Sequence, residues 1–398
     1  MGLGRRLCCC LQTKRLKWKQ NGPRDGEEEE EKGHGESWDL IFELETLEVA
    51  TDNFSEENLL GHGGFGPVYK GRLANGQEIA VKKLSVTSRQ GFNEFMNEVK
   101  FLVRVQHRNL VTLLGCCAHG GDKALVYDYL PNKSLDKFLF DKMKSSSLDW
   151  SKRYDIIFGV ARGLLYLHEE SPLRIIHRDI KASNILLDNQ LNPKISDFGL
   201  ARLFAAEDTH VSTFKIAGTH GYMAPEYALH GYLSVKSDVF SYGVLVLEIA
   251  SGWKNHDRRL PDESGDLLSY AWKLFRGGNV LDLVDKSLDT YDEGQAALCI
   301  QLGLLCCQAN ITDRPDMSTV NLILSSDSFI LPKPSKPGLQ GRRGYWSGTR
   351  STLGSGTNPS SSLNPSSTST GNSKMSNSTF MEDESRNSLS VSFTEEGR

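Results

Sequence analysis

Residues 177–184 and the Asp197-Phe198-Gly199 triplet carry side chains that could perform phosphoryl transfer. They supply the carboxylates of Asp179 and Asp197, the carboxamide of Asn184 and the ammonium group of Lys181. Phosphoryl transfer needs a group that orients a hydroxyl, oxygen ligands for magnesium, and positive charge near the moving phosphate. Either motif alone is weak, because such tripeptides also occur by chance in turns. The hypothesis therefore depends on partners elsewhere in the chain.

A first partner is the glycine-rich stretch at residues 61–68, which reads G-H-G-G-F-G-P-V. Glycines let a backbone turn fold over phosphates and present its N–H groups to the oxygens. A dinucleotide-binding turn has similar spacing but needs a helix directly after the last glycine. Here the β-favouring Val68-Tyr69-Lys70 follows, and no P-loop pattern occurs in the chain. The pattern favours a β-hairpin that covers a nucleotide.

The next segments predict a lysine and a glutamate that face each other. Ile79-Ala80-Val81-Lys82 reads as a strand that places Lys82 beneath the hairpin, with Lys83 on the opposite, solvated face. Apolar residues recur at helical spacing across roughly 90–105, so an amphipathic helix is expected there. Glu98 lies at the edge of its apolar stripe and can point toward Lys82, whereas Glu94 is expected to be a surface charge.

The elements that position these groups change in kind along the chain. Strands are predicted at 78–84 and 124–129, and a short helix at 46–54. The remainder, to about residue 331, is predicted to be mostly helical, at 149–170, 234–251, 267–275, 295–308 and 317–324. Strands first and helices later indicate an α+β arrangement with a small β-rich lobe and a larger α-rich lobe.

Composition excludes several classes of protein. The chain has 398 residues, 38% hydrophobic and 24% charged, with a net charge of −4, so a nucleic-acid partner is not expected. No apolar run approaches the roughly 18 residues of a membrane-spanning helix, and no secretory signal is expected. Adjacent cysteine pairs suit neither zinc nor a disulfide framework, so the last five of the eight cysteines are expected to be reduced thiols.

Taken in order, the motifs G-x-G-x-x-G-x-V, I-A-V-K, H-R-D-x-K-x-x-N, D-F-G and A-P-E (Ala224-Pro225-Glu226) resemble the eukaryotic protein kinase family. The resemblance implies a bilobal kinase fold over residues 54–331, with an N-lobe at about 54–129 and a C-lobe at about 130–331. Residues 1–53, basic and Cys-rich and then acidic, and the Ser/Thr/Asn-rich residues 332–398 are expected to be mostly disordered.

The resemblance also implies roles for individual residues. Asp179 would orient or accept the proton of the substrate hydroxyl, and Lys181 would neutralise the γ-phosphate, which favours Ser/Thr substrates without excluding some tyrosine activity. Asn184 would complete the catalytic set and, with Asp197, bind Mg²⁺, for which Mn²⁺ is an alternative. The expected nucleotide-binding residues are Leu60, Gly61, His62, Gly63, Gly64, Phe65, Gly66, Val68, Ala80, Lys82 and Glu98.

Regulation and support are implied in the same way. Arg178 would pair with a phosphate on the activation segment, for which Thr209, Ser212, Thr213 and Thr219 are candidate acceptors. Thr213 is the first choice, and Thr219 is also expected to contact substrate. Asp238 would hold the backbone of the His-Arg-Asp turn. Glu226 and Arg314 would form a buried ion pair.

Finer motifs, such as L-V-Y-D-Y-L-P-N-K-S-L-D and L-P-K-P-S-K-P-G, resemble plant receptor-like kinases of the cysteine-rich receptor-like kinase group. The chain departs from that group because it has neither a cysteine-rich ectodomain nor a transmembrane helix. His220 and Lys215 stand where relatives more often carry an aromatic residue and an arginine, which bears on substrate preference. The implied function is an ATP-dependent serine/threonine protein kinase in plant receptor-type signalling, such as defence or stress responses.

The N-terminus suggests a membrane surface. Cys8, Cys9 and Cys10 beside basic residues resemble a palmitoylation site, and acyl chains plus a basic patch give the two signals that anchoring needs. The expected location is the cytosolic face of the plasma membrane, near receptor kinases, with the cytoplasm and unmodified thiols as the alternative.

Two alternative functions are a pseudokinase scaffold and a small-molecule kinase. A pseudokinase usually loses the equivalent of Lys82, Asp179 or Asp197, and all three are present in this chain. The full activation segment argues against a small-molecule kinase.

Overall fold

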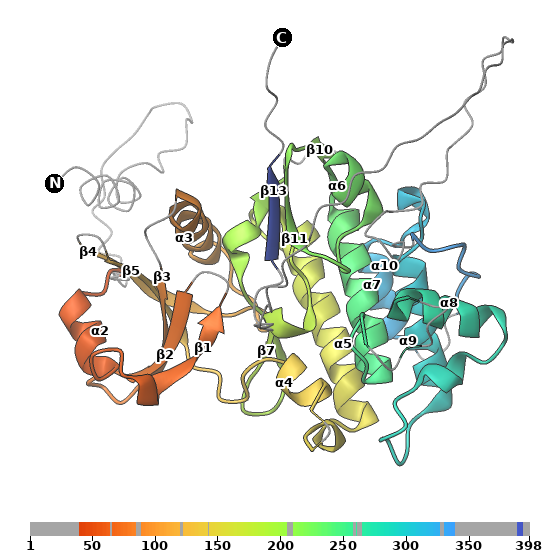
Figure 1. Cartoon of the computed structure of the whole chain (residues 1–398), viewed down its shortest axis with the longest axis horizontal. Helices are drawn as coiled ribbons and strands as arrows, with labels where there is room; N and C mark the ends of the chain where they lie inside the picture. The colour runs from red at the N-terminus through yellow and green to blue at the C-terminus, as the bar shows by residue number, and fades with distance from the viewer. Residues whose placement is uncertain are drawn as a thin grey trace, which may run out of the picture.

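The computed structural model describes residues 40–63, 66–84, 89–119, 122–141, 143–204, 210–257, 260, 265–326, 330–338 and 388–392. The first part of the chain forms an antiparallel five-stranded sheet in the order β1-β2-β3-β5-β4, and helices make up most of the second part (Figure 1). The α+β bilobal kinase fold expected from the sequence is confirmed. The predictions for residues 1–39, including Cys8, Cys9 and Cys10, lie outside the described residues.

The N-lobe sheet is covered on both faces. Its strands are β1 (Leu59–Gly63), β2 (Gly66–Arg72), β3 (Glu78–Leu84), β4 (Leu113–His119) and β5 (Asp122–Asp128). Ile79 and Val81 of β3 are fully buried in a small core with Leu47 of helix α2 (Leu44–Ala50). Leu84 and Leu125 belong instead to the main core, together with Phe95 of α3 (Arg89–Leu102). The alternation along β3 therefore buries apolar groups on both sides of the sheet.

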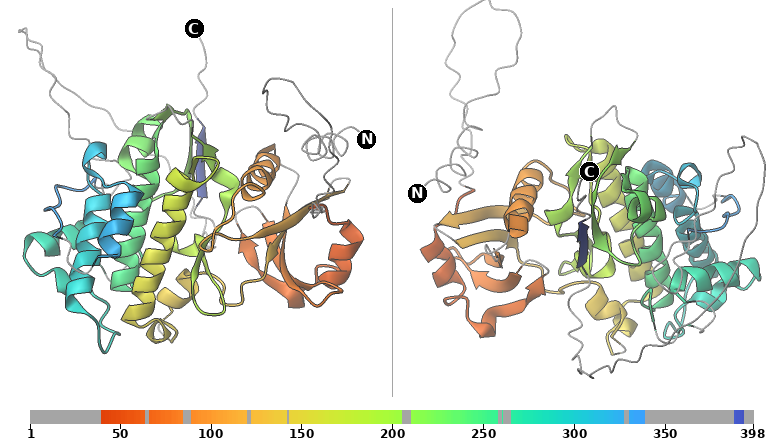
Figure 2. Two further views of the ribbon diagram at one scale, coloured as in Figure 1. Left: turned by 180° about the vertical axis from the view of Figure 1, so that it is seen from behind. Right: turned by 45° about the horizontal axis from the view of Figure 1, so that its top comes forward.

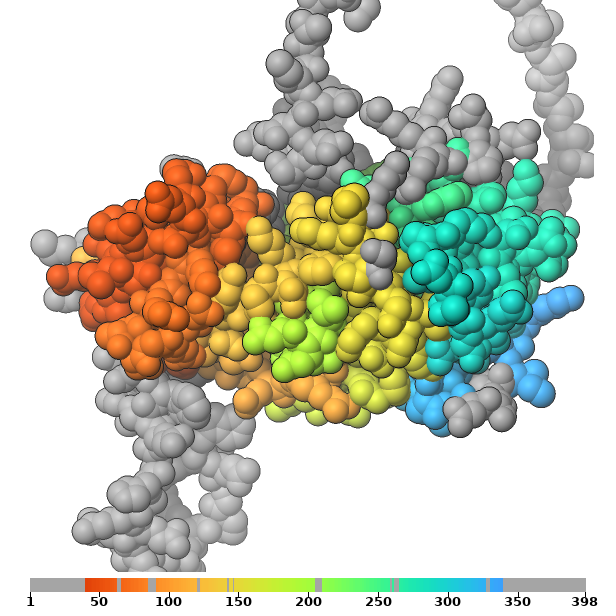
Figure 3. All heavy atoms as spheres, turned by 90° about the horizontal axis from the view of Figure 1, so that it is seen from below, coloured from red at the N-terminus to blue at the C-terminus, as the bar shows by residue number. Residues whose placement is uncertain are grey.

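The helical predictions for the C-lobe are confirmed with small shifts at their ends. The long helices are α5 (Trp150–Leu165), α7 (Val235–Ser251), α8 (Leu267–Arg276), α9 (Glu293–Cys306) and α10 (Met317–Leu324), with shorter α4 (Asp136–Leu139) and α6 (Pro225–His230). Residues 166–170 continue α5 as one π-helical turn. Seen from below, the two lobes form opposite ends of the molecule (Figure 3).

Helix α7 is the centre of the C-lobe. All its residues from Ser237 to Ser251 are buried. Ser234 and Ser237 form a capping box that satisfies backbone N–H groups at its start. It ends at Gly252, whose φ of 67° lies in the left-handed region, and a Cβ there would meet Asp285 Oδ2 at 2.2 Å. This position therefore requires glycine.

Four two-stranded sheets lie in the segments that follow the N-lobe sheet. They are β6 (Ile175–Ile176) with β9 (Arg202–Leu203), β7 (Ile185–Leu187) with β8 (Pro193–Ile195), β10 (Val211–Ser212) with β12 (Tyr232–Leu233), and β11 (Lys215–Thr219) with β13 (Ser388–Ser392). The views in Figure 2 show β13 lying beside β11, between the lobes. The described cysteines are all free, as expected, and all are buried: Cys116, Cys117, Cys299, Cys306 and Cys307.

Candidate active site

Lys82 lies in a buried triangle of charges between the lobes. Its Nζ donates to Glu98 Oε1 at 2.6 Å and to Asp197 Oδ1 at 3.1 Å. Burial alone would lower the pKa of Lys82, but the carboxylates of Asp197 and Glu98 outweigh it and raise the pKa above its usual value. Burial would likewise raise the pKa of Asp197, yet Lys82 and Lys181 hold it below its usual value. Lys82 and Asp197 are therefore both charged at neutral pH.

The predicted contact between Glu98 and Lys82 is present, but one prediction about α3 is wrong. Glu94 was expected at the surface, and its residue is only 3% exposed. Phe95, Val99 and Leu102 define the apolar stripe, and Glu94, the residue before Phe95, is buried as well. The helix thus buries a wider face than the spacing of its apolar residues indicates.

Tyr127 is a site residue that the sequence did not single out for a role. Its hydroxyl donates to Glu98 Oε2, so the two oxygens of Glu98 bind a tyrosine and a lysine. Burial, followed by the nearby Glu98 charge, raises the pKa of Tyr127 well above its usual value, which keeps the hydroxyl protonated as a donor. Tyr127 pairs with Ala80 across β5 and β3. The cross-strand register cannot be read from the sequence, and it is this register that places the Tyr127 ring beside Glu98.

The glycine-rich hairpin is described except for Gly64 and Phe65, which lie outside the described residues. Gly61, His62 and Gly63 of β1 pair with Val68, Pro67 and Gly66 of β2. Gly66 has φ of 145°, and a Cβ there would lie 2.0 Å from the carbonyl oxygen of Lys83. Val68 of β2 pairs with Lys82 of β3. The glycine-rich hairpin therefore lies directly beside the strand that carries Lys82. Leu60 is half-buried in β1.

Asp179 is held in a network with Asn184, Lys181 and Thr219. Asn184 Nδ2 donates to the backbone oxygen of Asp179 at 2.8 Å and to its Oδ2 at 3.0 Å. Lys181 Nζ lies 2.9 Å from Asp179 Oδ2 and donates to Thr219 Oγ1 at 2.7 Å. The Thr219 hydroxyl in turn donates to Asp179 Oδ1 at 2.6 Å. The carboxylate is thereby fixed, with only 4% of the residue exposed.

The backbone that carries Asp179 is anchored from α7. Asp238 accepts from the backbone N–H groups of His177 at 2.7 Å and Arg178 at 2.8 Å, and its Oδ2 lies 3.0 Å from His168 Nε2. Burial would raise the pKa of Asp238, but these contacts lower it. Arg178 has φ of 74° and Asp197 has φ of 68°. Such left-handed conformations cost on the order of 1–3 kcal/mol each, which the anchoring contacts offset.

Arg178 contacts the activation segment. Its guanidinium donates to the backbone oxygens of Leu200 at 3.1 Å and Lys215 at 3.0 Å, and to the hydroxyl of Tyr227. Among the candidate acceptors, Ser212 is exposed, Thr213 is half-buried and Thr219 is buried. The candidate Thr209 lies outside the described residues.

The expected ion pair at the end of this segment is present. Arg314 donates to both carboxylate oxygens of Glu226, at 2.7 and 2.8 Å, and only 1% of Arg314 is exposed. Two parallel charge-assisted hydrogen bonds between one guanidinium and one carboxylate form a strong and directional interaction. It ties α6, which follows the activation segment, to the loop between α9 and α10.

The donor set fits a hard cation. Both hydrogen bonds of Asn184 use its Nδ2, so its carboxamide oxygen is the atom that could meet Mg²⁺, with the carboxylate of Asp197 as second ligand. Among the described residues there is no group of three or more His, Cys, Asp or Glu side chains that could hold a metal. Two oxygen ligands are what Mg²⁺ usually takes from protein when phosphates and water complete its shell.

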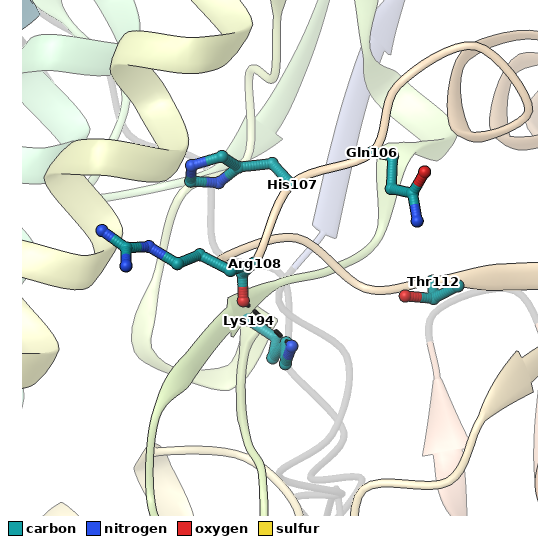
Figure 4. A pocket seen from close by; sticks show the side chains of 5 residues that line it. All are labelled: Gln106, His107, Arg108, Thr112 and Lys194. Atoms are coloured by element: carbon teal, nitrogen blue, oxygen red, sulfur yellow. Dashed lines mark hydrogen bonds between the residues drawn. The ribbon is translucent and has the colours of Figure 1, made fainter.

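A separate pocket of about 630 Å³ lies away from this network (Figure 4). Gln106, His107, Arg108, Thr112 and Lys194 line it, and Lys194 Nζ donates to the backbone oxygen of Arg108 at 2.9 Å. Burial and the charges of Arg108 and Lys194 lower the pKa of His107, so its ring adds no positive charge at neutral pH. No sequence motif had indicated this pocket.

Comparison with known proteins agrees with the geometry. Residues 54–324 match the family model of the protein tyrosine and serine/threonine kinases. Three relatives from Arabidopsis thaliana are similar over 75% of this chain: cysteine-rich receptor-like protein kinase 28 is 56% identical, cysteine-rich receptor-like protein kinase 10 is 54% identical, and receptor-like serine/threonine-protein kinase SD1-7 is 54% identical. The matches cover 44%, 45% and 36% of those proteins, respectively.

The chain thus spans between about a third and a half of the length of these relatives. Of the helices in the described part of the chain, none has the length and apolar character needed to cross a bilayer. The ordered kinase motifs, the bilobal fold and the family match lead to one conclusion. The chain belongs to the protein tyrosine and serine/threonine kinase family, and its kinase domain is similar to those of receptor-like kinases from Arabidopsis thaliana.

Proposed function

We propose that the chain transfers the γ-phosphate of ATP to serine and threonine hydroxyls of protein substrates. The observation that carries this proposal is the presence of two charge networks: Lys82 with Glu98 and Asp197, and Asp179 with Lys181 and Thr219. A pseudokinase scaffold would not need both charge networks assembled at once.

Each residue has a distinct task in the proposed reaction. Lys82 holds the α- and β-phosphates of ATP, and Glu98, braced by Tyr127, fixes the lysine. Asn184 and Asp197 would supply oxygen ligands for Mg²⁺, which would screen the charge between the phosphates. Asp179 orients the substrate hydroxyl and accepts its proton, while the ammonium of Lys181 faces the charge that develops on the transferred group.

Regulation by activation-segment phosphorylation is part of the proposal. A phosphate on Ser212 or Thr213 would compete with backbone oxygens for the guanidinium of Arg178, which already lies against Lys215, two residues after Thr213. The proposed signalling context is the cytosolic face of the plasma membrane, in plant defence or stress responses. Fractionation of cells that express a chain with Cys8, Cys9 and Cys10 changed to serine tests the membrane part; unchanged membrane content would refute it.

Autophosphorylation with Mg²⁺ and ATP tests the catalytic proposal. Lys82→Met and Asp179→Asn should each lower phosphate incorporation by at least about 100-fold, because each removes a group that acts in the transition state. Lys83→Met is the matched control, since Lys83 is half-exposed and pairs with Asp122 at the surface, 3.7 Å away. Equal incorporation by wild type and all variants would defeat the assignment.

A further inference from the structure

The pocket of Figure 4 lies where the loop between α3 and β4 meets strand β8, and both segments line it. Two backbone hydrogen bonds join the loop to the strand. The N–H of Val111 donates to the oxygen of Ile195 at 3.0 Å, and the N–H of Ile195 donates to the oxygen of Asn109 at 2.8 Å. These walls are held in place by the fold, so a ligand would bind with little ordering of the protein.

Positive charge gathers around one side of this pocket. Lys194 Nζ donates to the backbone oxygen of Arg108 at 2.9 Å, which brings the two cationic residues together. Burial, followed by the charge of Arg108, lowers the pKa of Arg162 in α5, so a third cation is near. Within the part of the chain that the structure describes, none of these three cations forms an ion pair with a carboxylate. An anion bound here would relieve their mutual repulsion.

Two carboxylates act on this cluster from neighbouring positions. Glu170 opposes the lowering of the His107 pKa, and Asp155 opposes the lowering of the Arg162 pKa. Asp155 is also 3.7 Å from Lys152, which balances its charge. The cations of the cluster outnumber these two acids, so this side of the pocket keeps a net positive charge.

His107 offers the pocket a hydrogen-bond donor. Its Nδ1 accepts from the backbone N–H of Asn109 at 3.1 Å, so we assign the proton of the neutral ring to Nε2. The ring stacks on Tyr166, with ring centroids 4.9 Å apart and an angle of 13° between the planes. Stacking fixes the ring and covers one of its faces. The Nε2–H group is therefore the polar group that His107 can present to a ligand.

The other side of the pocket is polar and uncharged. In Figure 4 the side chain of Arg108 extends to one side, and Gln106 and Thr112 lie on the other. Both are exposed, and their carboxamide and hydroxyl groups can donate as well as accept. A nucleotide base or a lipid chain would need an apolar or aromatic wall. A peptide main chain, with its N–H and carbonyl groups, suits these two side chains.

A phosphate group matches the positive side of the pocket. Phosphoserine and phosphothreonine carry a charge of about −1.5 to −2 at pH 7 and three acceptor oxygens. Ammonium and guanidinium donors form short, charge-assisted hydrogen bonds to such oxygens. The pocket volume of about 630 Å³ falls within the roughly 300–1,000 Å³ of sites that hold small organic ligands. A lone phosphate ion would leave much of it empty.

We propose that this pocket binds a phosphorylated serine or threonine side chain of a partner protein. The phosphate lies between Lys194 and Arg108, within reach of the Nε2–H of His107, and the flanking main chain lies against Gln106 and Thr112. The inference goes beyond the kinase reaction and does not rest on it, because none of these residues belongs to the two charge networks of the catalytic site.

Isothermal titration calorimetry on the full chain without ATP tests the proposal. The probes are the peptide acetyl-Gly-Gly-phosphoserine-Gly-Gly-amide, its unphosphorylated form and inorganic phosphate. The phosphopeptide should bind at least about tenfold more tightly than either of the others, because its phosphate and its main chain both make contacts. Lys194→Met and Arg108→Gln should each weaken its binding by about tenfold or more, the effect of losing one charge-assisted hydrogen bond.

Two variants serve as matched controls. Lys83→Met removes a half-exposed lysine of the N-lobe, and Lys82→Met alters the lysine of the catalytic site; both should bind the phosphopeptide as wild type does. Far-UV circular dichroism, and phosphorylation of casein within about twofold of wild type, check that Lys194→Met and Arg108→Gln fold. Should Lys194→Met unfold, the exposed Arg108 provides the decisive variant.

The outcomes separate this proposal from the proposed kinase activity. Equal affinities for the phosphorylated and unphosphorylated peptides would overturn it. Binding that is lost in Lys82→Met and kept in both pocket variants would place the phosphate in the catalytic site, and would overturn it as well. Inorganic phosphate bound as tightly as the phosphopeptide would show an adventitious ion only. A wild-type chain that is inactive on casein but binds the phosphopeptide as expected would refute the kinase proposal and support this one.

Discussion

Thr219 shows how one small side chain organises the site at the scale of a residue. Its hydroxyl accepts from Lys181 and donates to Asp179, so it holds the two charged groups at the geometry that the reaction needs. Thr219→Ala should lower kcat for casein by roughly 10- to 100-fold, since an H-bond that positions the proton acceptor is lost. Thr219→Ser keeps the hydroxyl and should retain most of the activity.

Steady-state kinetics on the two variants provide the measurement. Because Thr219 orients other groups, the loss should fall on kcat more than on the KM for ATP. If Thr219→Ser is as impaired as Thr219→Ala, the loss of activity comes from the missing methyl group or from a change in the fold. The role assigned to the hydrogen bond between the Thr219 hydroxyl and Asp179 would then be wrong. With only 7% of the residue exposed and its hydroxyl on a carboxylate, Thr219 is a poorer phosphate acceptor than the exposed Ser212.

At the scale of elements, the Glu226–Arg314 pair joins α6 to the loop before α10. Glu226→Gln should destabilise the chain by about 3–5 kcal/mol, because it leaves the buried guanidinium of Arg314 without its counter-charge. Urea unfolding measures the change. Glu78→Gln removes the exposed surface pair with Lys70 and is the matched control, for which no measurable change is expected. Equal effects of the two substitutions would contradict the role assigned to burial.

Residue patterns predicted the long elements well, and pairings between distant segments poorly. The periodicity of β3 and of α7 is local, so the sequence displays it directly. Two-residue strands such as β6 and β9 exist only because the fold brings them together. The motifs indicated the pairs of Lys82 with Glu98 and of Glu226 with Arg314. The contact of Tyr127 with Glu98 depends on sheet register, which no local pattern reveals.

At the scale of the whole molecule, a buried acid links stability to pH. Glu248 of α7 lies beneath the segment that follows Thr219: Tyr222 donates to both its oxygens at 2.7 Å and the backbone N–H of Asn255 donates at 2.9 Å. Burial raises the pKa of Glu248 to about 8, although the hydrogen bonds from Tyr222 and Asn255 oppose the shift. In the unfolded chain the carboxyl returns to its ordinary pKa of 4.5. Between these two values the folded chain holds a proton that the unfolded chain has released.

The free energy of unfolding should therefore fall as pH rises from about 5 to 8, by up to about 1.4 kcal/mol per pH unit from this group alone. Glu248→Gln cannot lose a proton, so its stability should decline less over this window and exceed that of wild type most clearly at pH 8. Urea unfolding at pH 5, 6.5 and 8 measures both slopes, with Glu78→Gln expected to run parallel to wild type. Parallel slopes for Glu248→Gln and wild type would show that Glu248 is already ionised in the folded chain at pH 5, held there by Tyr222 and Asn255.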